Sequence, residues 1–130
     1  MPLQIIDASL HTTAFPATYT GVGTLIGNCV QANTTSADVF GYFTSAGNVV
    51  QINCGFQAVQ VDVIDVTGVL IWHWQLGMPA TNTMKSAAAA LTVDTTGAVS
   101  ITSDPAGNTN VTLSAALCGT GKVICFHVQG

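Results

Sequence analysis

Residues 57–76, QAVQVDVIDVTGVLIWHWQL, decide the fold. Between residues 57 and 66 apolar and polar side chains alternate, which is typical of a β-strand with one face toward a core. The residues that alternate are Val59, Val61 and Val63 with Gln60 and Asp62. At Ile64–Asp65 the phase shifts, which predicts a twist or a bulge. Thr67–Gly68 predicts a two-residue hairpin turn into a second strand over 69–76.

The second strand of this hairpin contains both tryptophans of the chain. Because side chains alternate along a strand, the two indoles project from one face. Four large apolar side chains share that face: Leu70, Trp72, Trp74 and Leu76. The unbroken stripe favours burial, in the core or in a subunit contact, where each ring covers roughly 150–250 Å². An exposed pair would instead offer a stacking platform for a sugar. His73 and Gln75 occupy the opposite face, which we expect to meet solvent or a partner.

The remaining chain is rich in short apolar-alternating stretches separated by turn residues. Strands are predicted over 38–44, 48–54, 91–93, 98–102, 110–113 and 123–128. Residues 84–91, MKSAAAAL, fit either a helical turn or a strand of small residues. Several short strands at this spacing predict an all-β fold, specifically an antiparallel, jelly-roll-like β-sandwich.

The first 35 residues behave differently from the body at 36–130, because they are rich in Thr, Gly and Ala and alternate weakly. We interpret residues 1–35 as an extended N-terminal arm that pairs with a neighbour, or as irregular edge strands. The apolar residues that would make the arm contacts are Leu3, Ile5, Ile6, Leu10, Phe15 and Tyr19.

Charge is unusually scarce, with charged residues at 6% and a net charge of −4; typical soluble domains carry about 25%. Two lysines and no arginine argue against nucleic-acid binding, which needs basic clusters. No apolar run approaches the roughly 20 residues of a membrane span, so no membrane contact is predicted. A surface of Thr, Ser, Asn and Gln repels other surfaces weakly. We therefore expect an oligomer or a subunit of a larger assembly.

The four cysteines fit no common zinc spacing. The N-terminal residues show no signal peptide, which predicts synthesis in a reducing cytosol and free thiols. The alternative is a disulfide formed after release from a cell, for which Cys118 and Cys125, flanking a Gly-Thr-Gly turn, are the pair to test.

Catalytic chemistry finds little support in this residue inventory, so the chain is predicted not to be an enzyme and to need no cofactor. Asp62 and Asp65 lie three apart on one strand and hence on opposite faces, with Asp65 expected in solvent near the turn. Cys125 and His127 share a face, and we read them as a buried thiol beside an edge histidine. A metal site from His73, His127, Cys125 and Cys54 is conceivable in principle but not favoured.

Two parts of the chain carry a resemblance to known proteins. Between Phe40 and Ala80, the strings GYFTSAGN, INCGF, VQVDVIDVTG and WHWQLGMPA resemble small virion-associated proteins of tailed bacteriophages. The C-terminal strings LTVDTTGAVSIT, VTLSAAL and GKVICFHV resemble their final hairpins. The resemblance implies a β-sandwich component of the virion. Where such proteins often carry an acidic residue near the tryptophans, this chain has His73 and Gln75, which places any charge-based contact there in doubt.

By analogy, the resemblance implies a capsid decoration or cement protein. Such a protein would bind the outside of the major capsid protein shell as a homodimer or homotrimer, after synthesis in the host cytoplasm. The resemblance supplies no catalytic motif. The alternative hypothesis is a tail-fibre or host-recognition domain that holds glycans on aromatic side chains.

Overall fold

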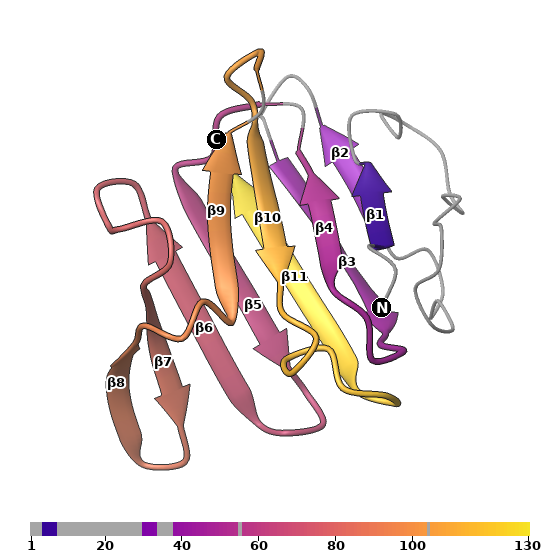
Figure 1. The fold of residues 1–130 in the computed structure, drawn as a ribbon, viewed down its shortest axis with the longest axis vertical. Helices are drawn as coiled ribbons and strands as arrows, with labels where there is room; N and C mark the ends of the chain where they lie inside the picture. Colours follow the sequence, from indigo (N-terminus) through magenta and orange to yellow (C-terminus); the bar gives the residue numbers. More distant parts are fainter. Residues whose placement is uncertain (1–3, 8–29, 34–37, 55, 104) are drawn as a thin grey trace.

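The computed structural model describes residues 4–7, 30–33, 38–54, 56–103 and 105–130. Over these residues the chain forms eleven strands and no helix (Figure 1), which confirms the predicted all-β class. The strands are Gln4–Asp7 (β1), Val30–Asn33 (β2), Asp38–Thr44 (β3), Val50–Asn53 (β4), Gln60–Asp65 (β5), Leu70–Gln75 (β6), Thr83–Ala87 (β7), Ala90–Asp94 (β8), Val99–Ser103 (β9), Thr109–Leu113 (β10) and Val123–Gln129 (β11).

The strands form two sheets that face each other. One has four strands in the order β1-β4-β10-β9, and the other has seven in the order β2-β3-β11-β5-β6-β7-β8. Pairing is antiparallel throughout, except that β1 runs parallel to β4. The chain passes from one sheet to the other after β1, β3, β4, β8 and β10. Those crossings tie the sheets together as the two layers of a sandwich.

The core fills the space between the sheets. Its largest fully buried side chains come from both layers: Phe43 and Ile124 from the seven-stranded sheet, Ile52 and Leu113 from the four-stranded one. Burying each such side chain contributes roughly 1.5–3 kcal/mol to stability. The alternation predicted for β5 appears as Val61 and Val63 buried, with Asp62 and Ile64 on the other side.

The predicted phase shift at Ile64–Asp65 is wrong, and so is the expected exposure of Asp65. The alternation continues to the end of β5, which turns Asp65 inward at 0% exposure. Its Oδ1 accepts a hydrogen bond from the Gly68 backbone N–H at 2.8 Å. Its Oδ2 lies 3.5 Å from Lys122 Nζ. Lys122, which is distant in the sequence, therefore compensates the charge of the buried Asp65 carboxylate, which the local sequence had predicted to be in solvent.

The connection between β5 and β6 also differs from the prediction. Asp65 is the last residue of β5 to pair, and it pairs with Leu70, so the turn spans four residues rather than two. The Asp65 carboxylate accepts the Gly68 N–H within this wider turn, and Val66 N–H donates to Val123 O at 2.9 Å. A Cβ added at Gly68 would lie 2.5 Å from Asp65 Oδ2, so the turn requires glycine at that position.

Residues 84–91 lie mostly in strands β7 and β8, joined by a tight turn at Ala88–Ala89. Of the two readings left open by the sequence, the strand of small residues is the one observed. β7 pairs along β6, and β8 pairs along β7 as the last strand of the sheet. Both strands extend past β9, the edge of the smaller sheet (Figure 1).

Two short strands lie in the predicted N-terminal segment. β1, which contains Ile5 and Ile6, forms the edge of the four-stranded sheet, and β2 forms an edge of the seven-stranded sheet. Leu3, Leu10, Phe15 and Tyr19, the other predicted arm contacts, lie outside the described residues.

Candidate functional site

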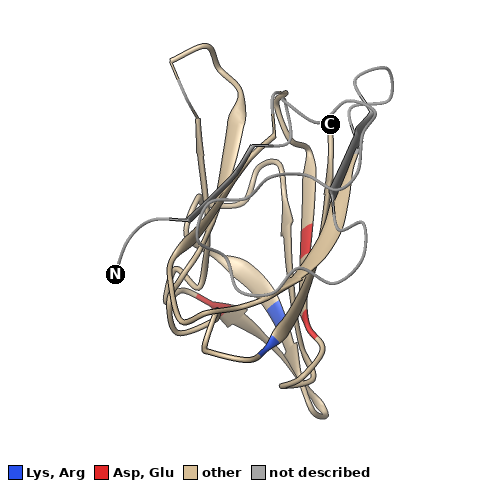
Figure 2. Ribbon diagram, turned by 90° about the vertical axis from the view of Figure 1, so that its right-hand side faces the viewer, with Lys and Arg blue, Asp and Glu red and all other residues tan. Residues whose placement is uncertain are grey.

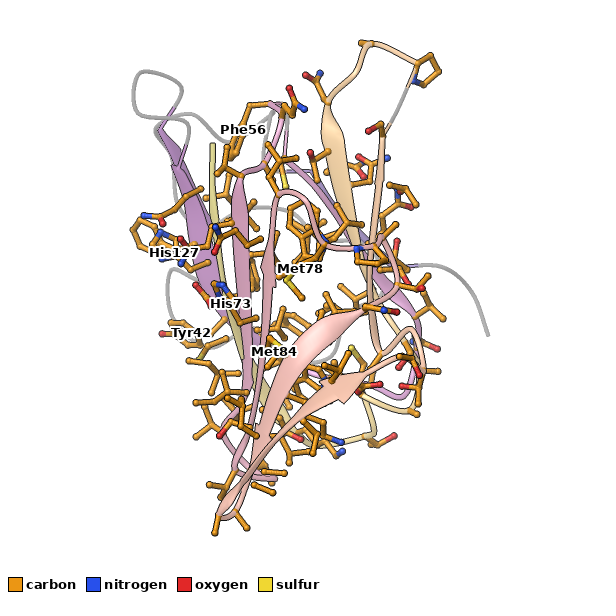
Figure 3. The ribbon with its side chains drawn as sticks, turned by 90° about the vertical axis from the view of Figure 1, so that its left-hand side faces the viewer. Tyr42, Phe56, His73, Met78, Met84 and His127 are labelled. Atoms are coloured by element: carbon orange, nitrogen blue, oxygen red, sulfur yellow. The ribbon has the colours of Figure 1, made fainter. Side chains whose placement is uncertain are left out.

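The outer face of the seven-stranded sheet is one that no other described strand covers. It is formed by the side chains that alternate with the core residues on six strands. We define the outer face by Phe40, Tyr42, Asp62, Ile64, Ile71, His73, Met84, Ser86, Leu91, Val93, Cys125 and His127. In Figure 3 the labelled Tyr42, His73 and His127 project from the same side of this sheet.

The register places these residues in two straight rows. One row crosses the sheet as Phe40, His127, Asp62, His73, Met84 and Val93. The neighbouring row crosses it as Tyr42, Cys125, Ile64, Ile71, Ser86 and Leu91. Directly opposed residues on adjacent strands lie about 4.5–5.5 Å apart, so each row forms a continuous band of contacts.

Polar groups on the outer face are concentrated in the middle of the first row. His73 Nδ1 lies 2.6 Å from Asp62 Oδ1, and because a carboxylate only accepts, Nδ1–H is the donor. Gln60 Nε2 donates to Asp62 Oδ2 at 3.1 Å. The His127 ring contacts the Phe40 ring edge-on, with centroids 6.2 Å apart. Asp62 is therefore the one carboxylate among the defining residues, and both of its oxygens have partners.

Much of the rest of the outer face is apolar, and five of its apolar side chains are exposed: Phe40, Ile64, Ile71, Leu91 and Val93. Phe40, Ile71, Leu91 and Val93 are between 44% and 68% exposed. At the end of the face near the β5–β6 turn lies a hollow of about 190 Å³, lined by Ile64, Val69, Leu70, Ile71, Ser86 and Ala88. Aligned apolar side chains with a hollow among them are typical of a surface that packs against another protein.

The predicted apolar stripe is divided by the structure. Trp72 and Trp74 belong to the core, at 3% and 5% exposure, and Leu70 packs half-buried beside them. Trp72 Nε1 donates to Asp94 Oδ2 at 2.9 Å, and Trp74 Nε1 donates to Pro79 O at 3.3 Å. Leu76 follows β6 and is 54% exposed. The two indoles therefore offer no stacking surface to a sugar.

The two residues predicted for a partner face have different surroundings. His73 lies in the middle of the outer face, half-buried against Asp62. Gln75 is exposed at the end of β6, where it pairs with Gln60 of β5. Asp62 and Asp65 point to opposite sides of β5, as predicted, so they form no carboxylate pair.

The described cysteines are free, which makes the suggested Cys118–Cys125 disulfide wrong. Cys118 lies in the core, whereas Cys125 lies on the outer face, so the sheet separates them. Burial raises the pKa of the Cys54 and Cys118 thiols to about 12, and it raises the pKa of Cys125 as well. All three thiols are therefore protonated near neutral pH and poorly nucleophilic.

Within the described part of the chain, no group of three or more His, Cys, Asp and Glu side chains could hold a metal ion. The same residues contain no helix that is long and apolar enough to cross a membrane. The convergence of His73, His127, Cys125 and Cys54 is also excluded by position, because Cys54 lies in the core while the other three lie on the outer face.

Sequence reasoning missed the β7–β8 side of the outer face. Met84, Leu91 and Val93 extend both rows, and their alternation became readable only once residues 83–94 were known to form a hairpin. It also missed that Lys85 and Asp94 point to the inner side of that hairpin, opposite Trp72 and Thr83. The one sequence signal for a strand here was the alternation of side chains from Met84 to Ser86, and the run of alanines that follows interrupts this alternation.

Comparison of the chain with known protein families, with curated proteins and with solved structures gave no match. The fold and the outer face define a two-sheet β-protein with an almost uncharged, uncovered sheet face.

Proposed function

We propose that this protein is a structural component of a tailed-phage virion, a decoration or cement protein that binds the major capsid protein shell through its outer face. The observation that carries the proposal is the uncovered apolar face, on which Asp62 is the one defining carboxylate and is hydrogen-bonded to His73 and Gln60. Such a face can be desolvated against a second surface without leaving an unpaired charge.

The size of the face supports a contact that depends on many copies. Six strands spaced about 4.8 Å apart, with about five residues each at about 3.3 Å, give a projected area of about 450 Å². A standard protein interface takes about 800 Å² from each partner. One contact of this size is weak, but a lattice of copies multiplies weak contacts into stable attachment.

The hollow beside Ile71 supplies an anchor point within that area. Its volume of about 190 Å³ and its mainly apolar lining fit a single large side chain of the partner. Binding energy in protein interfaces concentrates at such buried anchors. We therefore place the main contact at the Ile64–Ile71 end of the outer face.

The proposal includes finer features of the assembly. The protein would form a homodimer or homotrimer on the capsid exterior after synthesis in the host cytoplasm, with residues 1–35 as an arm and a jelly-roll-like sandwich as the body. The repeated passage of the chain between sheets supports the relation to jelly rolls. The short edge strand β1 supports an arm, because edge strands add readily to a neighbouring sheet.

The alternative, a glycan-binding host-recognition domain, is less well supported. Its proposed platform, Trp72 and Trp74, is buried, and the aromatic rings on the outer face are Phe40 and Tyr42.

Binding to undecorated capsids tests the proposal directly. Ile71→Asp places a charge beside the hollow and is expected to abolish co-sedimentation with capsids while the thermal unfolding midpoint stays near the parent value. Gln57→Asp, at an exposed position outside the face, adds the same charge and is the matched control. Unchanged binding by Ile71→Asp, or glycan-array binding without capsid binding, would overturn the proposal.

A further inference from the structure

A larger cavity lies on the inner side of the sandwich, where β7 and β8 extend past the edge of the four-stranded sheet (Figure 1). Its volume is about 340 Å³, at the lower end of the range of small-molecule sites. Leu70, Trp72 and Leu117 supply apolar lining, and Thr96 and Ser114 supply hydroxyl groups. The cavity is separate from the outer face, because β6 and β7 lie between them.

Both basic residues of the chain, Lys85 and Lys122, line this one cavity. Figure 2 shows their two blue segments close together near the lower end of a ribbon that is otherwise almost uncharged. The polar surface of this chain consists mainly of Thr, Ser, Asn and Gln and does not depend on lysine. The presence of both ammonium groups at one cavity therefore indicates that they interact with groups at that cavity.

Lys122 forms an ion pair within the fold, whereas Lys85 has a cation–π contact and no ion pair with a described side chain. Lys122 Nζ lies 3.5 Å from the buried Asp65 carboxylate. Lys85 lies on the inner side of β7, with Nζ 5.4 Å from the centroid of the Trp72 ring. No carboxylate of the described side chains lies within ion-pair distance of Lys85. Lys85 is half-buried, so its ammonium group over the Trp72 ring remains able to meet an added anion or water.

Asp94, the nearest candidate counter-ion, is occupied by other donors. Its Oδ2 accepts from Trp72 Nε1 at 2.9 Å, and its Oδ1 accepts from Thr96 N and Thr96 Oγ1 at 2.8 and 2.5 Å. Burial alone would raise the pKa of Asp94, but these hydrogen bonds and nearby Lys85 lower it below the usual range. Asp94 is thus a fixed anion that orients the cavity wall and leaves the Lys85 N–H groups free to donate.

No acidic side chain that the structure describes, Asp62, Asp65 or Asp94, forms an ion pair with Lys85. Three acidic side chains lie outside the described set, those of Asp7, Asp38 and Asp104. The backbones of Asp7 and Asp38 lie in β1 and β3, away from the β9 and β7–β8 edges that border the cavity.

We propose that this cavity binds a carboxylate on a short apolar stem, with the carboxylate at Lys85 and the stem against Trp72 and Leu117. The Ser114 hydroxyl accepts from Leu117 N–H at 3.1 Å, so its own hydrogen is available to the ligand. Lys122 is paired with Asp65, and Lys85 has no ion pair with a described side chain, so the cavity tolerates one added negative charge better than two. A monoanionic carboxylate therefore fits better than a phosphate.

Fluorescence of Trp72 reports on the cavity. In a Trp74→Phe background, Trp72 is the remaining indole, and titration with sodium butyrate is expected to give a saturable change that sodium chloride does not give. Backbone amide shifts of Lys85 and Thr96, measured by NMR on the unsubstituted protein, provide a second readout. Lys85→Met keeps the apolar stem, removes the charge and is expected to weaken binding about 10- to 100-fold, whereas Lys85→Arg should retain it.

Ser86→Asp changes the net charge by the same amount as Lys85→Met, but on the outer face of the same strand, so it should leave butyrate binding intact. Two peptide arms identify the source of the carboxylate: acetyl-Ala-Ala-Asp-Ala-amide and its Asn analogue. Tighter binding of the Asp peptide than of butyrate points to a partner polypeptide, and the reverse points to a free small acid. The absence of saturable binding by any carboxylate, or equal binding by Lys85→Met, would overturn the proposal. Neither result depends on capsid binding. The carboxylate-binding proposal and the capsid-binding proposal can therefore be overturned independently.

Discussion

The two faces of the seven-stranded sheet treat charge in opposite ways. On the outer face, Asp62 is hydrogen-bonded to His73 and surrounded by exposed apolar side chains. On the inner face, Asp65 and Asp94 are buried, and both lysines lie beside them. Of the five charged side chains that the structure describes, four therefore lie on the inner side of this sheet and Asp62 lies on its outer face. The outer face is kept nearly neutral, and the comparison predicts that neighbouring residues on opposite faces respond very differently to substitution.

The largest expected difference is between Trp72 and its neighbour Ile71. Trp72→Ala removes a buried ring and leaves Asp94 Oδ2 without its donor, so we expect a loss of about 3–5 kcal/mol in the free energy of unfolding. Ile71→Ala, on the outer face, should cost less than about 1 kcal/mol. Urea denaturation followed by circular dichroism measures both. Equal losses would mean that the outer face is covered in the isolated protein.

A smaller effect is expected at Asp94, the fixed anion of the inner face. Asp94→Asn should lower stability by about 1–3 kcal/mol at pH 7, because it weakens charge-assisted hydrogen bonds to Thr96 and Trp72. Since the pKa of Asp94 is lowered on folding, its contribution is present above its ordinary pKa of 3.8 and is lost as the pH falls through the folded value. The stability gap between the parent and Asp94→Asn should therefore narrow below pH 3.8. A gap that stays constant to pH 2 would contradict this assignment.

The smallest effect is expected at Val69, where the two faces meet in the β5–β6 turn. Val69 is exposed with φ at 57°, a left-handed conformation that costs a β-branched residue about 1–2 kcal/mol. Val69→Gly should therefore raise the free energy of unfolding by up to about 1 kcal/mol, after the added flexibility of the unfolded chain is subtracted, which urea denaturation measures. Val66→Gly, in the same turn without positive φ, is the control and should be destabilising or neutral.

The local sequence pattern was sufficient to predict which side chains are buried where a strand has one apolar face. The alternation of Val61 and Val63 and the shared face of Trp72 and Trp74 were readable directly, and the structure places all four side chains in the core. Local pattern failed at Asp65, because an aspartate before Thr-Gly is typical of a solvated turn. The continued alternation of β5 buries Asp65, and Lys122 compensates its charge through a contact that the pairing of β5 with β11 creates.

The inner cavity was unpredictable for a related reason. Alanine favours helix by intrinsic propensity, so residues 87–90 obscured the hairpin. Pairing of β7 with β6 overrides that preference, and only this pairing shows that Lys85 faces Trp72 rather than solvent. Of the two residues predicted for a partner face, His73 lies in the middle of the outer face and Gln75 lies at the end of β6. The apolar rows of the outer face could not be predicted, because they appear only when six strands are aligned.

The position of β8 has a consequence for handling the protein. As the last strand of the seven-stranded sheet, it presents one row of backbone N–H and C=O groups that no described strand covers. Proteins commonly protect such edges with lysine or proline, and Ala90–Asp94 contains neither. Its outward side chains, Leu91 and Val93, are apolar as well. At high concentration, molecules of the free protein should therefore aggregate by pairing β8 edges. Leu91→Lys places a positive charge on this strand and should reduce the aggregation.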